Sequence, residues 1–149
     1  MKPFFTLTAF TALFQVAYSF DPGVYIIALA LEPSTILEDT GSGQPLRFET
    51  SPLSTNGFWT FATTDHQFFT IQNQPGDYIT CETTGDKICS LGKKPQSFEL
   101  LRSADDDAYV LVEKTSKLFL RLLPQAPKEP GLQLGSNDVY AKFNCNLLE

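Results

Sequence analysis

The residues best suited to chemistry in this sequence are its three cysteines, Cys81, Cys89 and Cys145. Cys81 and Cys89 stand eight positions apart, with the segment Thr-Thr-Gly-Asp between them. A zinc site would need more Cys or His at ligand spacing, and a redox pair would have Cys-x-x-Cys spacing. The sequence offers neither. Because the number of cysteines is odd, at least one must stay free or pair with another molecule.

The single histidine, His66, follows Asp65 in "TTDHQFF". A Ser-His-Asp triad would also need a nucleophile held in a recognisable strand-turn-helix context, and no such motif occurs in the chain. We therefore interpret His66 as a loop residue. We predict no catalytic residues and no cofactor, and we expect that the protein is not an enzyme.

Three consecutive carboxylates, Asp105, Asp106 and Asp107, form the densest acidic run. Calcium loops space their oxygen ligands at alternate positions and usually include a glycine for the turn. Three adjacent aspartates fit a solvated turn between strands better. We expect no metal site.

The first nineteen residues read as a signal peptide. Lys2 supplies a positive start, an uncharged apolar run follows, and Ala17 and Ser19 are small residues at the positions read by signal peptidase. The alternative, a membrane anchor, would need about 20 apolar residues, and this run is shorter and is followed at once by Asp21. We expect cleavage after Ser19, secretion to the extracellular space and no stable membrane insertion.

Removing residues 1–19 from the 149 of the full chain leaves 130, which suits one domain with a core of its own. The remaining chain has 10 basic and 17 acidic residues and hence a net charge of −7. Phosphate binding needs clustered Lys and Arg, and the densest basic spot is the pair Lys93 and Lys94. We therefore do not expect nucleic acid as a partner. We expect the protein to be a monomer.

The rest of the chain lacks helical periodicity. Short runs with period-two alternation are separated by Gly, Pro, Asn, Asp and Ser, as in "GFWTFAT", "QFFTIQN", "DYITCE" and "AYVLVE". The 13 Phe and 5 Tyr of the chain favour strands that pack on one face. Many short strands at even spacing indicate an all-β sandwich or barrel.

A four-strand pattern recurs three times with a period near forty residues. The first strands align on aromatic residues, each followed two positions later by an aliphatic one: Tyr25, Phe69 and Tyr109. The second strands align on Ile36, Ile79 and Phe119, and the closing strands begin with Trp59, Phe98 and Tyr140. One such unit cannot bury its apolar face alone, whereas three around an axis can. Because Trp59, the only tryptophan, occupies a repeated position, we interpret it as a core residue rather than a platform for a sugar.

The repeated unit resembles that of the β-trefoil superfamily, in particular the ricin-B-type lectin module and small secreted fungal trefoil proteins. The second element of the unit is seen in "PGDYITC" and "TSKLFLR", and the fourth in "FWTF" and "QSFEL". The resemblance implies an all-β chain that forms a β-trefoil of three four-stranded repeats. The domain would span residues 20–149, with repeats at about 23–65, 66–106 and 107–149.

The resemblance also implies a non-enzymatic recognition module with carbohydrate as the leading ligand. The ricin-B pattern has an Asp just after the core residue of the second strand, and the aligned residues here are Leu37, Thr80 and Leu120. None has a carboxylate for sugar hydroxyls. Of the pattern's Gln-x-Trp, only Gln96 and Phe98 in "QSF" come close. The sugar-binding residues of the family are therefore not carried over, and the binding residues stay unknown.

Two long loops, residues 50–57 and 123–131, keep other functions open. The second contains three prolines, which stiffen a loop and lower the entropy lost on binding. It motivates an alternative function as a loop-mediated inhibitor of a secreted protease. A third alternative is an effector that binds a secreted protein partner.

In the trefoil alignment, Cys81 and Cys89 lie on the second and third strands of the middle repeat. Cys81 shares the side of Ile79 and Cys89 that of Leu91, so both sulfurs face inward if the alternation holds. An oxidising compartment favours a disulfide between them. Cys145 would then be the free thiol, with a pairing between Cys145 and either of the others as the competing arrangement.

Overall fold

The computed structural model describes residues 20–50, 55–65, 67–103, 107–123, 131–136 and 142–148. Across these residues the chain forms one sheet of twelve strands and a single 3-10 turn, η1 (Thr55–Gly57). Six of the strands build a barrel: β1 (Gly23–Leu29), β4 (Trp59–Asp65), β5 (Phe68–Gln72), β8 (Phe98–Arg102), β9 (Tyr109–Glu113) and β12 (Phe143–Leu147). The other six pair as hairpins: β2 (Ile36–Glu38) with β3 (Arg47–Glu49), β6 (Tyr78–Cys81) with β7 (Cys89–Gly92), and β10 (Phe119–Leu123) with β11 (Gly131–Gly135).

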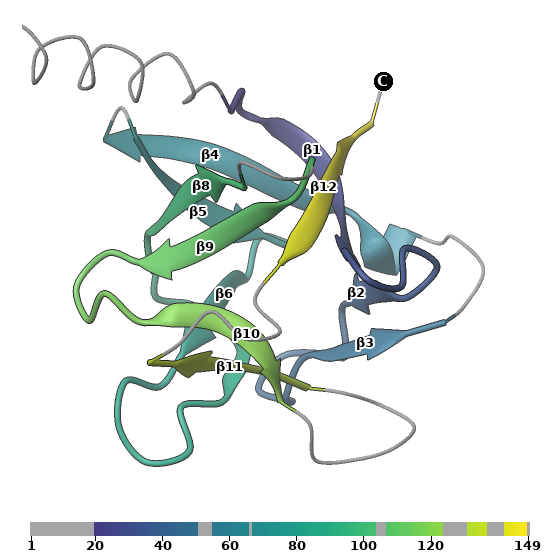
Figure 1. Ribbon diagram of the computed structural model, residues 1–149. Helices are drawn as coiled ribbons and strands as arrows, with labels where there is room; N and C mark the ends of the chain where they lie inside the picture. The colour runs from purple at the N-terminus through teal and green to yellow at the C-terminus, as the bar shows by residue number, and fades with distance from the viewer. Residues whose placement is uncertain are drawn as a thin grey trace, which may run out of the picture.

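The barrel closes through antiparallel pairs in the order β1, β12, β9, β8, β5, β4 and back to β1. Each hairpin joins the barrel at one equivalent position, where Ala28 pairs with Ile36, Gln72 with Tyr78, and Val112 with Phe119. Figure 1 shows the hairpin strands β3, β6, β10 and β11 below the barrel strands. Closure of the ring leaves the barrel strands without exposed edges. The all-β prediction of three four-stranded units is confirmed.

The aligned residues of the first and closing strands meet as cross-strand partners inside the barrel. Tyr25 pairs with Trp59, Phe69 with Phe98, and Tyr109 with Phe143. The third closing strand therefore begins at Phe143, whereas the predicted Tyr140 lies outside the described residues. The interpretation of Trp59 is confirmed: it is fully buried, and its Nε1 donates to the Leu37 backbone oxygen at 3.0 Å.

The register predicted for two of the second strands was wrong by one residue. The position equivalent to Ile79, one step beyond the junction with the barrel, is held by Leu37 and Leu120, both at most 1% exposed. The prediction had aligned Ile36 and Phe119 there. In "STILE" the adjacent residues Ile36 and Leu37 are both apolar, and in "KLFLRLL" Phe119 and Leu120 are. The alternation alone therefore fits either register, and pairing with the barrel decides it.

The expected disulfide between Cys81 and Cys89 is present in the structure. The two residues are directly opposite each other on β6 and β7, and both are buried among core residues. Cys145 is a free cysteine that packs against the core from β12. Burial raises the pKa of its thiol to about 12.

The barrel end away from the hairpins is covered by Phe20, the residue that follows the predicted cleavage point. Its ring stacks on Tyr25 at a centroid distance of 4.5 Å and meets the rings of Phe61, Phe69 and Tyr109 at 5.1 to 5.3 Å. Because Tyr25, Phe69 and Tyr109 are equivalent residues of the three repeats, Phe20 lies close to the pseudo-threefold axis. Asp21 follows, and its backbone oxygen accepts a hydrogen bond of 2.6 Å from the Tyr25 hydroxyl.

Candidate binding site

The corrected register changes the residues that follow the core position of each second strand. They are Glu38, Thr80 and Arg121 instead of Leu37, Thr80 and Leu120. A carboxylate, a hydroxyl and a guanidinium thus stand at equivalent places on the outer faces of the three hairpins. The conclusion from sequence that no carboxylate occupies these positions is corrected by Glu38, which is 8% exposed.

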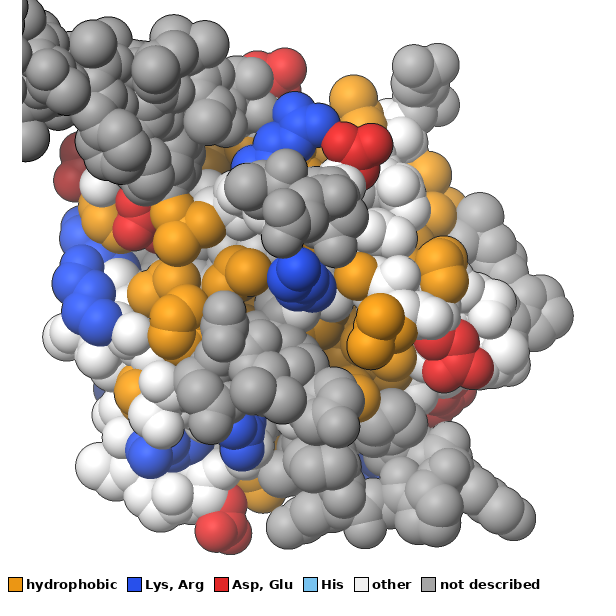
Figure 2. All heavy atoms as spheres, viewed as in Figure 1, with side chains coloured by type: hydrophobic (Ala, Val, Ile, Leu, Met, Phe, Trp, Pro, Cys, Tyr) orange, Lys and Arg blue, Asp and Glu red, His pale blue; other side chains and the backbone are white. Residues whose placement is uncertain are grey.

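On the third hairpin, Arg121 lines an open pocket of about 300 Å³ between the second and third repeats. The lining residues are polar or small for the most part: Gly85, Asp86, Lys87, Arg121, Gln133, Leu134, Gly135 and Ser136. They come from the turn between β6 and β7, from the strands β10 and β11, and from the residue directly after β11. In Figure 2, Lys and Arg side chains lie over this region, at the lower left of the molecule.

The Arg121 guanidinium is held by the side chain of Gln133, its partner across the hairpin. The amide orientation that satisfies both residues places the Gln133 oxygen 2.9 Å from Nε and 2.8 Å from Nη2 of Arg121. The amide nitrogen then donates to the backbone oxygen of Asp86 at 3.3 Å. Gln133 is 8% exposed, and its amide links the guanidinium to the turn of the neighbouring repeat.

Gly135 provides the floor on which the Arg121 side chain lies. A methyl group at Gly135 would come within 2.4 Å of both Cδ and Nε of Arg121. The arginine could therefore not keep its position beside any residue other than glycine. This close approach, together with the Gln133 bonds, gives the guanidinium a defined place.

Backbone contacts between hairpins fix the two sides of the pocket relative to each other. Leu134 donates its N–H to the backbone oxygen of Lys87 at 2.9 Å, and Ile88 and Gln133 form a β-bridge. Lys87 itself has a φ of 55°, a left-handed conformation that is uncommon outside glycine. The pocket is therefore built on paired backbone rather than on loose loops.

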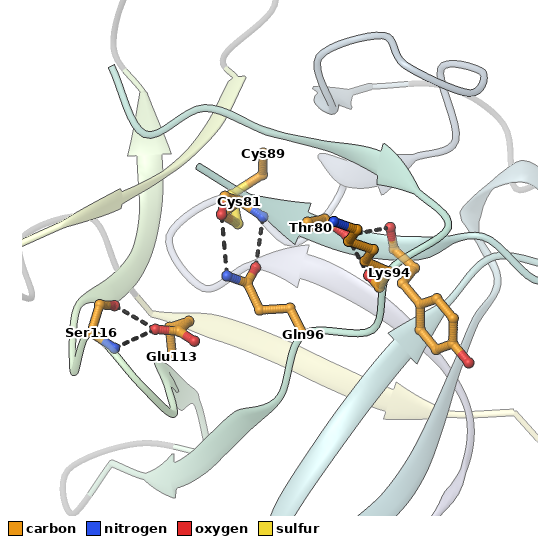
Figure 3. Close-up of a disulfide and its surroundings, with 8 residues drawn as sticks. Thr80, Cys81, Cys89, Lys94, Gln96, Glu113 and Ser116 are labelled. Atoms are coloured by element: carbon orange, nitrogen blue, oxygen red, sulfur yellow. Dashed lines mark hydrogen bonds between the residues drawn. A yellow bond between two sulfur atoms is a disulfide. The ribbon is translucent and has the colours of Figure 1, made fainter. Parts of the chain in front are cut away.

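A second open pocket, of about 380 Å³, lies beside the disulfide, between the second repeat and the turn after β9. Its lining residues are Thr83, Pro95, Gln96, Ser97, Glu113, Lys114 and Thr115. Figure 3 shows that the polar side chains here are engaged within the chain. The Gln96 amide accepts from the Cys81 N–H at 2.6 Å and donates to the Cys81 oxygen at 3.1 Å. Thr80 likewise donates to the backbone oxygen of Lys94 at 3.0 Å.

Glu113 is the buried carboxylate of this second pocket, 2% exposed. It accepts hydrogen bonds from the N–H groups of Thr115 and Ser116, at 3.1 and 2.6 Å, and from the Ser116 hydroxyl at 2.5 Å. The Glu113 carboxylate thus accepts its hydrogen bonds from the β9–β10 turn. Asn73 holds the equivalent position in the second repeat, where its Oδ1 accepts from Gly76 and Asp77. Both side chains shape turns, and the pocket near Arg121 is the better candidate for a ligand.

The residues singled out from the sequence do not gather at one place. Asp107 is exposed and pairs with Arg102, while Asp105, Asp106 and His66 lie outside the described residues. The same is true of residues 51–54 and 124–130 of the two long loops and of the predicted signal peptide. Within the described part of the chain, no three His, Cys, Asp or Glu side chains come together as a metal site, and no helix is long and apolar enough to cross a bilayer.

Arg121 was missed because its significance depends on strand register. The sequence signal was present as an alternation in "KLFLRLL", with Arg121 the only charged residue between apolar ones. The predicted register placed Leu120 at the ligand position. Gln133 and Gly135 became part of the site only through their pairing with β10.

Comparison with solved structures places this geometry in a known fold. A designed threefold-symmetric protein, ThreeFoil, superposes with a TM-score of 0.73 over 85% of this chain and 99% of its own, at 13% identity. The chain is a β-trefoil. The ricin B-like lectin of Macrolepiota procera, solved with lactose, matches the trefoil with a TM-score of 0.73 at 16% identity, over 88% of this chain and 100% of the lectin.

The agglutinin of Rhizoctonia solani matches with a TM-score of 0.74 at 15% identity, over 88% of this chain and 99% of the agglutinin. No protein-family model and no curated protein sequence matches the trefoil. At these identities the likeness concerns the fold.

Proposed function

We propose that this trefoil is a secreted, non-enzymatic recognition module that binds carbohydrate through the Arg121 pocket. The observation that carries the proposal is the pocket itself. It is open and polar, it rests on paired hairpin backbone, and it contains the residue that follows the core position of the second strand. In the ricin-B pattern the residue at that position binds the sugar.

Two structural neighbours support carbohydrate as the ligand class. The Macrolepiota procera lectin was solved with lactose, and the Polyporus squamosus lectin with a sialylated trisaccharide. The second matches this chain with a TM-score of 0.63 at 18% identity, over 85% of this chain and 50% of the lectin. Sugar sites of this kind work through a few placed polar groups in a pre-formed hollow, and the hairpin faces of this trefoil offer such groups.

The test is a glycan array probed with the secreted protein, including fungal and plant wall polymers. We expect saturable binding to at least one glycan, competed by the free sugar. Absence of binding to every glycan would remove carbohydrate as the ligand class.

Secretion is tested separately by expression of the full chain in a secreting host and mass spectrometry of the product. We expect a mature protein that begins at Phe20. Retention of residues 1–19 in the cell-associated protein would contradict the proposed secretion. We also expect this product to elute as a monomer in size-exclusion chromatography.

A further inference from the structure

We infer that the Arg121 pocket selects glycans that carry a carboxylate, such as uronic or sialic acids, over neutral ones. This inference rests on the proposed carbohydrate function and names the chemical class of its ligand. It follows from the chemistry of the lining residues.

The first argument is the reversal of hydrogen-bonding polarity at the ligand position. A carboxylate there accepts hydrogen bonds from sugar hydroxyls, whereas a guanidinium can only donate. The ligand group next to Arg121 must therefore be an acceptor. A carboxylate is the strongest acceptor that sugars carry, and its hydrogen bonds with a guanidinium are charge-assisted.

The second argument is that the guanidinium is pre-positioned. Gln133 binds it through Nε and Nη2, and Gly135 lies directly under its side chain. A donor held in place loses little conformational entropy when a ligand binds, so more of the interaction energy remains as affinity. Lys87 lines the same pocket, so its described lining residues carry two positive charges and one carboxylate, that of Asp86.

The third argument concerns what the pocket lacks. None of its eight described lining residues is aromatic. Gly135, which lies against the Arg121 side chain, has no ring on which a sugar could stack. A neutral pyranose would thus obtain no stacking face from these residues, and Asp86 is the one carboxylate among them that could accept from its hydroxyls. Charge-assisted hydrogen bonds remain as the main source of affinity.

The overall charge limits the ligand to one with few acidic groups. The full chain has a net charge of −6, so a polyanion would be repelled outside the pocket. A glycan with a single terminal acid can place its charge beside Arg121 and keep its neutral part over the rest of the surface. Such an interaction should weaken as salt is raised, because the pocket is open.

The experiment compares matched acidic and neutral glycans on the same array, followed by titration calorimetry. The pairs are sialyllactose with lactose, and neutral oligosaccharides that end in a single glucuronic or galacturonic acid with their carboxyl-reduced forms. We expect acidic members to bind at least about tenfold more tightly at low salt, since hydrogen bonds to charged groups are the strong ones. We expect this preference to shrink as NaCl is raised from about 50 to about 500 mM, because salt screens the interaction between the charges.

Three variants assign the preference to the pocket. Arg121→Ala should abolish it, and Gly135→Ala should reduce it strongly without any change of charge, because the new methyl group displaces the Arg121 side chain. Arg102→Ala is the matched control, because Arg102 is an exposed arginine outside the pocket that pairs with Asp107. It should leave the preference intact. Thermal unfolding of each variant checks that the fold is kept.

The outcomes separate the inference from the proposed function. Glycan binding with no preference for the acid, or an acid preference that survives Arg121→Ala, overturns the inference while carbohydrate binding stands. No binding to any member of the pairs or of the wider array removes both. An equal loss in Arg121→Ala and Arg102→Ala would reduce the effect to overall charge and would also overturn the assignment to the pocket.

Discussion

At one end of the barrel three hairpins meet through backbone contacts, whereas at the other end a single aromatic ring, Phe20, covers the opening. The hairpin end is joined by the bridges Pro45–Ser90 and Ile88–Gln133 and by the pair Gly131–Arg47, one between each two hairpins. At the opposite end the described residues meet through the ring contacts of Phe20 and the hydrogen bond from the Tyr25 hydroxyl to the Asp21 oxygen.

The difference shows why the hairpin end is where a binding site can form. Paired backbone joins the hairpins to one another, so the residues at the equivalent outward positions, Glu38, Thr80 and Arg121, can differ while the inward residues stay apolar. At the Phe20 end the side chains themselves make the closure. A polar group introduced there would be buried without a partner.

The largest effect is expected from the hairpin end. Ile79→Ala removes a fully buried side chain at the point where the second hairpin meets the core. We expect the free energy of unfolding to fall by about 3 kcal/mol, as for other large-to-small core changes. Urea denaturation measures it. The outward, 36% exposed Val24 serves as control through Val24→Ala, and equal losses in both variants would contradict the inward register.

Removal of the disulfide should have the next largest effect. Replacing Cys81 and Cys89 by alanine frees a loop with a sequence separation of 8. The chain-entropy relation gives a loss of about 2.5 kcal/mol for a loop of this length. Calorimetric or urea unfolding of the double variant, compared with the oxidised parent protein, checks the value, and the reduced parent serves as control. A change well under 1 kcal/mol, about the scale of a surface substitution, would mean that β6 and β7 stay paired without it.

Phe20→Ala tests the ring that closes the other end. The ring contacts four aromatic side chains, but it belongs to a residue close to the expected mature terminus, where the chain is less constrained. We therefore expect a loss of about 1.5 kcal/mol, below the usual range for a core phenylalanine. We also expect faster labelling of the Cys145 thiol by a thiol reagent. Phe20→Leu should restore most of both, and unchanged labelling would show that Phe20 does not shield the thiol.

The smallest effect is a dependence on alkaline pH. Burial raises the pKa of Cys145 from 9.0 to about 12, so the folded state keeps a proton that the unfolded chain releases. The contribution is therefore fully present below pH 9 and is lost as the pH rises toward 12. We expect unfolding free energy to be about 1 kcal/mol lower at pH 10 than at pH 8.

Cys145→Ala should remove that part of the pH dependence in urea titrations. Burial also raises the pKa of Tyr25 and of Tyr109, which adds a loss of the same sign at still higher pH. A pH dependence that is unchanged in Cys145→Ala would assign it to the tyrosines instead.

Much of the fold could be predicted because its signal is local. The aromatic residues Tyr25, Phe69 and Tyr109 lie at or near the start of a strand. Turns rich in Gly, Pro, Asn, Asp and Ser separate the strands, so period and strand number follow from the order of residues alone. The middle repeat was placed correctly through "DYITC", in which both neighbours of Ile79, Tyr78 and Thr80, carry a hydroxyl group. Where two apolar residues are adjacent, as in Ile36 and Leu37, the local pattern has no preference between two registers.

The sequence by itself determined that the chain is all-β, that three similar units share one core, and that Cys81 and Cys89 can face each other. These properties depend on which residue types recur and at what spacing. Only the tertiary structure decided which residues stand on the outer hairpin faces and that Arg121, Gln133 and Gly135 form one site with the turn of the neighbouring repeat. The physical reason is that a one-residue shift in a short strand exchanges its two faces. Only pairing with the barrel and with the adjacent hairpin distinguishes the two alternatives.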